Sequence, residues 1–205
     1  MSDLLSFLRF DVQINKRYFA FALALALGYA IFLGRHGSGV LALTAVMAFL
    51  GPTLIPWWTI GHDRAKGTIV MLTSLPITRL RLTTLKALEA FTISVVLGFC
   101  VAILLVAMGQ PRIDLASAFL IGIPWSLSAC LVSTGSFLLL SSRVAFYLLF
   151  PAYFAIMYTF GRLVYSNPFA ALEKFAWVVC VTVLASLLFL VVATRIWAQR
   201  VSPCD

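Results

Sequence analysis

Residues 87–108 read A-L-E-A-F-T-I-S-V-V-L-G-F-C-V-A-I-L-L-V-A-M, an apolar run whose single charged side chain is Glu89. A helix needs about 20 such residues to cross the hydrocarbon core of a bilayer, so this run is long enough to span a membrane. The whole chain of 205 residues has the same character, since 62% are hydrophobic and 11% are charged. A soluble domain carries about 25% charged residues. The composition therefore predicts an integral membrane protein.

Five further apolar runs surround this one and have lengths near that of a membrane span. We therefore expect an all-α membrane protein whose single transmembrane domain covers residues 1–205. Prolines inside or at the ends of these runs, at positions 52, 56, 124 and 151, are expected to kink the helices. The six predicted spans are Tyr18–Leu33, Val40–Trp57, Ala87–Met108, Leu115–Leu140, Val144–Phe160 and Phe175–Ile196.

The segments outside the spans also have a pattern. Residues 1–17 place polar and basic side chains on one side of a helix, which favours a helix in the membrane interface. A secretory signal peptide is the alternative, because Ala22, Ala24 and Ala26 have the small-residue spacing of a cleavage site, but two acidic residues count against it. Residues 161–174, between the fifth and sixth spans, are expected to form an extracytoplasmic segment that dips into the outer leaflet.

Basic residues are distributed unequally between the two sides of the predicted membrane. Eleven of the fifteen fall on the side that holds both termini and the residues between the second and third spans. Positive charge marks the cytosolic side, so we expect this side in the cytosol of a cell membrane. The net charge of +8 is thus interpreted as topology-setting, without a nucleic-acid partner. The four basic residues on the other side are Arg35, Arg112, Arg162 and Lys174.

Catalytic, nucleotide and metal motifs are lacking in the sequence. The glycine-rich residues 34–39 lack the Lys-Ser/Thr ending of a phosphate-binding loop and are interpreted as a turn. The cysteines lack metal-ligand spacing and are expected to be packing residues. Glu89 is the only acid within a span, and Lys86 precedes it at i, i+3, which predicts an interfacial ion pair. We therefore expect no enzyme activity, no metal and no cofactor bound by this chain.

Two spans have distinctive side chains. The fourth contains small and polar residues between positions 126 and 136, which favour close helix packing and, second, a polar lining. The fifth is aromatic, which favours helix packing and, in a transporter, a substrate path. The candidate path residues are Phe150, Tyr153, Phe154 and Tyr158.

Residues 58–86 form the one long interruption of the apolar chain. Residues 63–74 can form a short helix with an apolar surface, and Pro76 ends it because the residue before a proline disfavours the helical region. Thr78 is the predicted N-cap of a second helix that begins at Arg79 and continues into the third span. Such an element can lie on its own bilayer or dock into a groove on a soluble partner.

The residues of this loop resemble those of the permease subunits of type 2 ATP-binding-cassette exporters. The resemblance lies in Asp63-Arg64-Ala65-Lys66-Gly67, in Leu72-Thr73-Ser74-Leu75-Pro76-Ile77-Thr78-Arg79 and in Lys86 at the start of the third span. It implies that residues 58–86 are a cytosolic coupling loop whose helix is seated on an ATPase. The residues implied to contact the ATPase are Asp63, Arg64, Lys66, Gly67, Leu72, Ser74, Leu75, Pro76, Thr78 and Arg79.

The resemblance also implies how the chain would work. A separate cytosolic ATPase would use ATP and Mg, and this chain would be half of the membrane part, paired with a second copy or a paralogue. Spans one, two and five would line the substrate path. The complex would lie in the plasma membrane of a prokaryote. The aromatic fifth span favours an amphipathic substrate such as a peptide, a lipid or a drug. The alternatives are a membrane scaffold that docks a cytosolic partner without transport, and a self-contained channel or carrier.

Overall fold

The computed structural model describes residues 2–36, 39–65, 78–141, 144–145, 147–149, 151 and 168–200. Within these ranges the regular secondary structure is helical and contains no strand, as the sequence predicts. The helices are α1 (Ser2–Arg35), α2 (Gly39–Ala45), the π-helical turn η1 (Val46–Leu50), α3 (Gly51–Ala65), α5 (Arg79–Ala107), α6 (Arg112–Leu139) and α8 (Pro168–Arg200).

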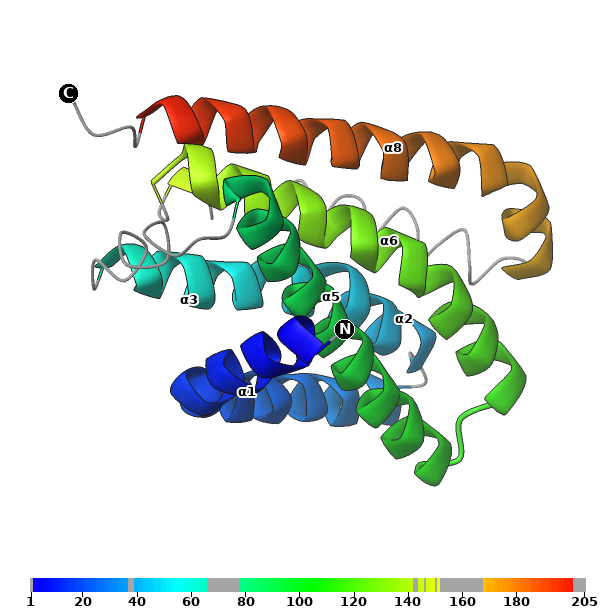
Figure 1. Ribbon diagram of the computed structural model, residues 1–205. Helices are drawn as coiled ribbons and strands as arrows, with labels where there is room; N and C mark the ends of the chain where they lie inside the picture. Colours follow the sequence, from blue (N-terminus) through cyan, green and yellow to red (C-terminus); the bar gives the residue numbers. More distant parts are fainter. Residues whose placement is uncertain are drawn as a thin grey trace.

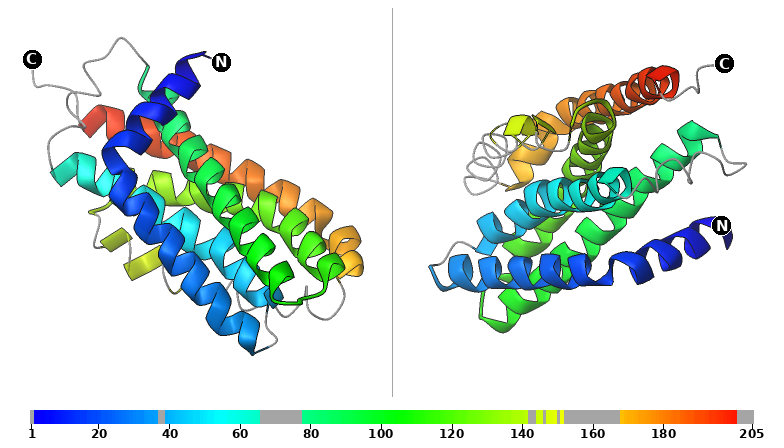
Figure 2. Two further views of the ribbon diagram at one scale, coloured as in Figure 1. Left: turned by 90° about the horizontal axis from the view of Figure 1, so that it is seen from below. Right: turned by 90° about the vertical axis from the view of Figure 1, so that its left-hand side faces the viewer.

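Helix α6 lies at the centre of the bundle and packs against α8, α5, α3, α2 and η1. Helix α8 covers one side of α6, and α1 lies on the opposite side of the bundle against α5 and α2 (Figures 1 and 2). The central position of α6 explains its small and polar residues. Ser126, Cys130, Ser133 and Thr134 are fully buried, so the packing role predicted for the fourth span is confirmed.

Four of the six predicted spans coincide with helices that are long and apolar enough to cross a membrane. These are Lys16–Arg35, Arg79–Ala107, Leu115–Leu139 and Ala176–Gln199. Together they indicate a multi-pass membrane protein. Most of the predicted fifth span lies outside the described residues, as do residues 161–167 of the predicted segment 161–174 and residues 66–77 of the loop 58–86. Residues 168–174 of that segment belong to α8. The interfacial segment 1–17 belongs to the same helix as the first span, α1 (Figure 2).

The predicted second span is helical throughout, but it is divided into α2, η1 and α3. At the junction the Gly51 N–H bonds to the Val46 carbonyl, five residues earlier, where an α-helix would use the carbonyl four residues earlier. Pro52 and Pro56 follow, and neither has a backbone N–H to donate to the preceding turn. These three interruptions explain why the ribbon changes direction between α2 and α3 (Figure 1).

Small residues bring the inner helices close together. A Cβ on Gly51 would lie 2.7 Å from the Ser94 Cβ and 3.0 Å from the Ser94 Cα, so α3 and α5 meet at van der Waals distance. Met47 of η1 fills the space beside two glycines, Gly98 and Gly122. A Cβ added to Gly98 would lie 2.8 Å from the Met47 sulfur, and one added to Gly122 would lie 3.1 Å from it. These contacts pack η1 and α3 closely against α5 and α6.

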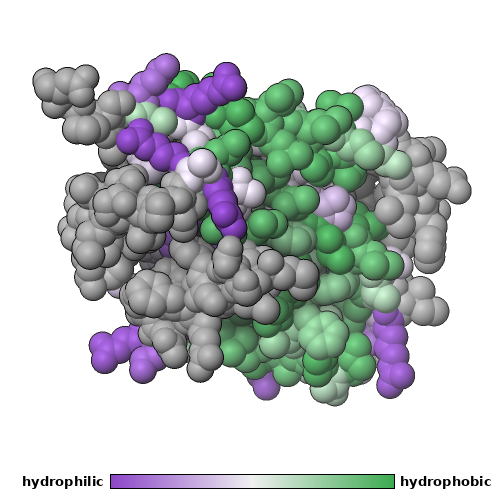
Figure 3. Space-filling view, viewed as in Figure 1, coloured by the Kyte–Doolittle hydropathy of each residue, from purple (hydrophilic) through white to green (hydrophobic). Residues whose placement is uncertain are grey.

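The outer surface is apolar, as an environment of lipid requires. Large hydrophobic side chains are exposed along α1, α5, α6 and α8, and Leu188 in α8 is 68% exposed. Figure 3 shows these side chains covering the middle of one face, with hydrophilic side chains toward its ends. A soluble monomer rarely exposes an apolar patch of this extent.

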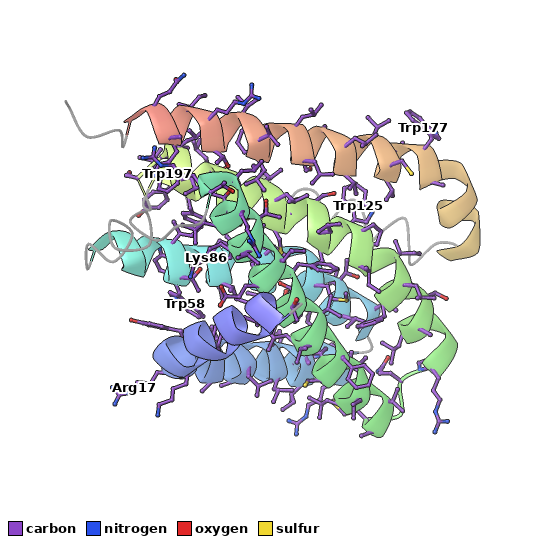
Figure 4. All side chains as sticks on the ribbon, viewed as in Figure 1. Arg17, Trp58, Lys86, Trp125, Trp177 and Trp197 are labelled. Carbon is purple, nitrogen blue, oxygen red and sulfur yellow. The ribbon has the colours of Figure 1, made fainter. Side chains whose placement is uncertain are left out.

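The two ends of the bundle are built from different helix termini. At one end the Gln110 Nε2 donates to the Gly34 carbonyl at 3.1 Å, which ties the α5–α6 turn to the end of α1. At the other end lie the end of α3, the start of α5 and the end of α8. Arg17, Trp58, Lys86 and Trp197 lie toward this second end in Figure 4, and Trp177 lies toward the first.

Candidate partner-docking loop and its anchorage

The predicted partner-binding residues fall partly within the described chain. Asp63 and Arg64 lie in the last turn of α3, and Thr78 and Arg79 begin α5. The candidate contacts outside the described residues are Lys66, Gly67, Leu72, Ser74, Leu75 and Pro76, and so are the candidate path residues Phe150, Tyr153, Phe154 and Tyr158. The described geometry therefore concerns the two flanks of the loop.

Thr78 is the N-cap of α5, as the sequence predicts. Its backbone is non-helical, with φ −59° and ψ 140°, and its hydroxyl accepts a hydrogen bond from the Arg81 N–H at 3.3 Å. An N-cap side chain satisfies one of the N–H groups that the first turn leaves without a helical partner. Helix α5 therefore begins directly at the end of the loop and continues as one helix to Ala107.

Arg79 connects the start of α5 to the end of α8. Its guanidinium donates to the carbonyl of Ala198 and lies over the ring of Trp197, 6.0 Å from the ring centroid. Both contacts suit a cation, because the last carbonyls of a helix and the face of an indole carry partial negative charge. Arg79 was predicted to contact an ATPase, and within this chain it binds α8.

Thr83 continues this contact one turn further along α5. Its hydroxyl lies 2.9 Å from that of Thr194 in α8, and both residues are buried. We call the contact made by Arg79 and Thr83 with Thr194, Trp197 and Ala198 the α5–α8 clasp. It fixes the loop-side turns of α5 to the last turns of α8.

Lys86 and Glu89 form the predicted ion pair, with Lys86 Nζ 3.7 Å from Glu89 Oε2. Both side chains are buried, at 6% and 0% exposed. The reason is that α5 turns this side toward the other helices of the bundle, where Thr83 and Ala87 are also buried. A buried pair of opposite charges is a strong constraint, because the removal of one partner leaves the other charge in a medium of low polarity.

Trp197 is one of the residues of this site that the sequence did not single out. Its side chain is 3% exposed and belongs to a hydrophobic cluster with Ile60 of α3 and Leu138 of α6. Residue type and spacing do not specify its pairing with Arg79, because that pairing depends on how the helices pack. Trp197 therefore links the clasp to Ile60, near the end of α3 that leads into the loop.

Within the described chain, no group of three or more His, Cys, Asp and Glu side chains is placed to hold a metal ion. Cys100, Cys130 and Cys180 are free thiols. Buried Cys130 lies 3.8 Å from the Ser94 hydroxyl at the contact of α5 with α6, which fits the packing role expected for it.

Comparisons of the chain with models of known protein families, with curated proteins and with solved structures found no match.

Proposed function

We propose that the chain is the membrane-spanning permease subunit of a type 2 ATP-binding-cassette exporter. In this proposal a separate cytosolic ATPase binds and hydrolyses ATP with Mg, and the chain itself has no enzyme activity. The subunit pairs with a second copy or a paralogue and exports an amphipathic substrate such as a peptide, a lipid or a drug. Six spans, with both termini in the cytosol, cross the plasma membrane of a prokaryote.

The observation that carries the proposal is the position of the motif relative to the helices. Residues 66–77 connect α3 to α5. The N-cap of α5 is Thr78, which is the second-last residue of the motif at positions 72–79. A force on the loop therefore acts directly on a helix long enough to span the membrane. Thr78 and Arg79 would serve the ATPase contact by holding the loop in place, since Arg79 is engaged with α8.

The remaining roles follow from the sequence. Asp63, Arg64, Lys66 and Gly67 would form the first part of the ATPase contact, and the motif that runs to Pro76 would form the second. Leu72 and Leu75 supply its apolar surface. The aromatic residues of the fifth span would line the substrate path between the two subunits of the membrane part.

The test is co-purification from the native membrane in a mild detergent, followed by mass spectrometry. The chain is compared with a variant in which Leu72→Asp and Leu75→Asp remove the apolar surface of the loop. Gln199→Glu, an exposed position near the end of α8, controls for added negative charge at the same end of the bundle. We expect an ATPase with phosphate-binding-loop motifs to accompany the native chain and the control, but not the Leu72/Leu75 variant.

Two outcomes would contradict the proposal. Recovery of the ATPase with all three proteins would place its contact outside the loop. Recovery of a non-ATPase partner, lost only in the Leu72/Leu75 variant, would favour a membrane scaffold that docks a cytosolic protein without transport.

A further inference from the structure

We propose that η1 is a hinge within the predicted second span, about which α3 moves relative to α2 while α5 and α8 remain joined. The proposal goes beyond the proposed function, because it concerns the mechanics of this chain and holds for any partner that docks on the loop. It rests on the backbone of residues 46–56, on the packing around Met47, and on the contrast with α5.

The backbone of residues 46–56 has fewer α-helical hydrogen bonds than a regular helix. The Gly51 N–H bonds to Val46 in the π-helical pattern, and Pro52 and Pro56 have no N–H to donate. Sharp bends in helices occur at these features, so flexion of this span should concentrate here.

An unbranched side chain and three glycines line part of the junction. Met47 is fully buried, and its neighbours on α5 and α6 are Gly98 and Gly122. Methionine is unbranched and adapts to changes of packing, and glycines present a smooth backbone surface to it. Gly51 meets the Ser94 backbone without a side chain of its own. The branched side chains of Val46, Thr53 and Ile55 are also buried here, so the proposed rotation of α3 is a small one.

Helix α5, on the other side of the loop, has the opposite construction. It is one α-helix from Arg79 to Ala107, contains no proline, and has a hydrogen-bonded N-cap. The α5–α8 clasp then joins its first two turns to the end of α8 through Arg79 and Thr83. Flexion should therefore be taken up at η1 in the second span and not in α5.

The test measures distances between spin labels in the full-length chain reconstituted in lipid nanodiscs. The background replaces Cys100, Cys130, Cys180 and Cys204 with serine. Leu184, which is 61% exposed on α8, carries the reference label. The second label is placed at Leu54 of α3 or at Leu80 of α5.

We expect the Leu54–Leu184 distance distribution to be about twofold broader than the Leu80–Leu184 distribution, because collective helix motions broaden only the first. Pro52→Ala combined with Pro56→Ala restores two N–H donors and should narrow the first distribution to the width of the second. Pro124→Ala, which changes an interior proline of α6, should leave both widths unchanged. Thermal unfolding checks that each variant is folded.

Equal widths for the two label pairs in the parent protein would overturn the hinge. Failure of the Pro52/Pro56 variant to narrow the Leu54–Leu184 distribution would overturn it as well. An equal narrowing by Pro124→Ala would place the flexibility in α6.

Discussion

The hydroxyl of Thr83 lies 2.9 Å from the hydroxyl of Thr194, in the buried contact between α5 and α8. The Thr83 hydroxyl is also placed to donate to the Leu80 carbonyl at 3.0 Å and the Thr194 hydroxyl to the Leu190 carbonyl at 2.7 Å, so either can be the donor between the two helices. Hydrogen bonds between helices fix their rotation, which apolar packing in a membrane leaves less well defined. The last turns of α8 are therefore held in register with the helix that follows the loop.

Replacing either threonine with valine should lower the free energy of unfolding by about 1 kcal/mol, the net value of a typical hydrogen bond. The double variant should lose less unfolding free energy than the two single variants lose together. The difference is the coupling energy, which is about 0.6 kcal/mol for hydrogen bonds between membrane helices. The measurement is a double-mutant cycle by unfolding in mixed micelles. Strict additivity would show that the contact contributes no pairwise energy.

Gly51→Ala should destabilise the protein, because the new Cβ would lie 2.7 Å from the Ser94 Cβ and 3.0 Å from its Cα. Overpacking of this kind costs about 1–3 kcal/mol. Gly28→Ala is the matched control, since an added Cβ there has no atom within 4 Å. We expect this control to stabilise α1 by up to about 1 kcal/mol through helix propensity. Melting temperatures in detergent compare the two, and an equal effect of both substitutions would contradict the close contact of α3 with α5.

Lys86→Met and Glu89→Gln should each destabilise the bundle, because each leaves the other charge buried without its ion-pair partner. The loss from breaking a buried pair is about 3–5 kcal/mol. The double variant removes both charges and should recover more than half of this loss. Thermal unfolding of the three variants in detergent measures the effect. Single variants as stable as the parent would show that the pair is solvated in the membrane protein.

The helical class and the long spans could be predicted from the sequence because they depend on local composition and length. Thr78 was identified as the N-cap because capping depends on a residue and its three successors. For the division of the second span into α2, η1 and α3, the only indication in the sequence was the presence of Pro52 and Pro56. The π turn itself depends on how Met47 packs against Gly98 and Gly122 of other helices.

The contacts at the candidate site were harder to predict, because they join residues more than 100 positions apart. Nothing in the local sequence of Arg79 indicates that it meets Ala198 and Trp197. The burial of Glu89 was also missed, because its position near the end of a span suggested an interface. Which side of α5 faces the bundle is decided by the neighbouring helices.

The orientation proposed for the chain can be tested by labelling single cysteines in the cysteine-free background. Pro111 is exposed in the turn between α5 and α6, at the end of the bundle opposite to the loop. We expect Pro111→Cys to react with a membrane-impermeant maleimide in spheroplasts, and Ser74→Cys to react only after permeabilisation. The opposite pattern would place the loop outside the cell and exclude a cytosolic ATPase at this site.

The most direct measurement is photo-crosslinking in living cells from benzoylphenylalanine at position 72 or 75, the apolar positions of the loop. Position 188 on the apolar outer face of α8 is the control. We predict that positions 72 and 75 both crosslink to the same ATPase with phosphate-binding-loop motifs, and that position 188 does not. Crosslinks from the loop to lipid alone, or to a protein without ATPase motifs, would contradict the assignment of the chain as an exporter permease.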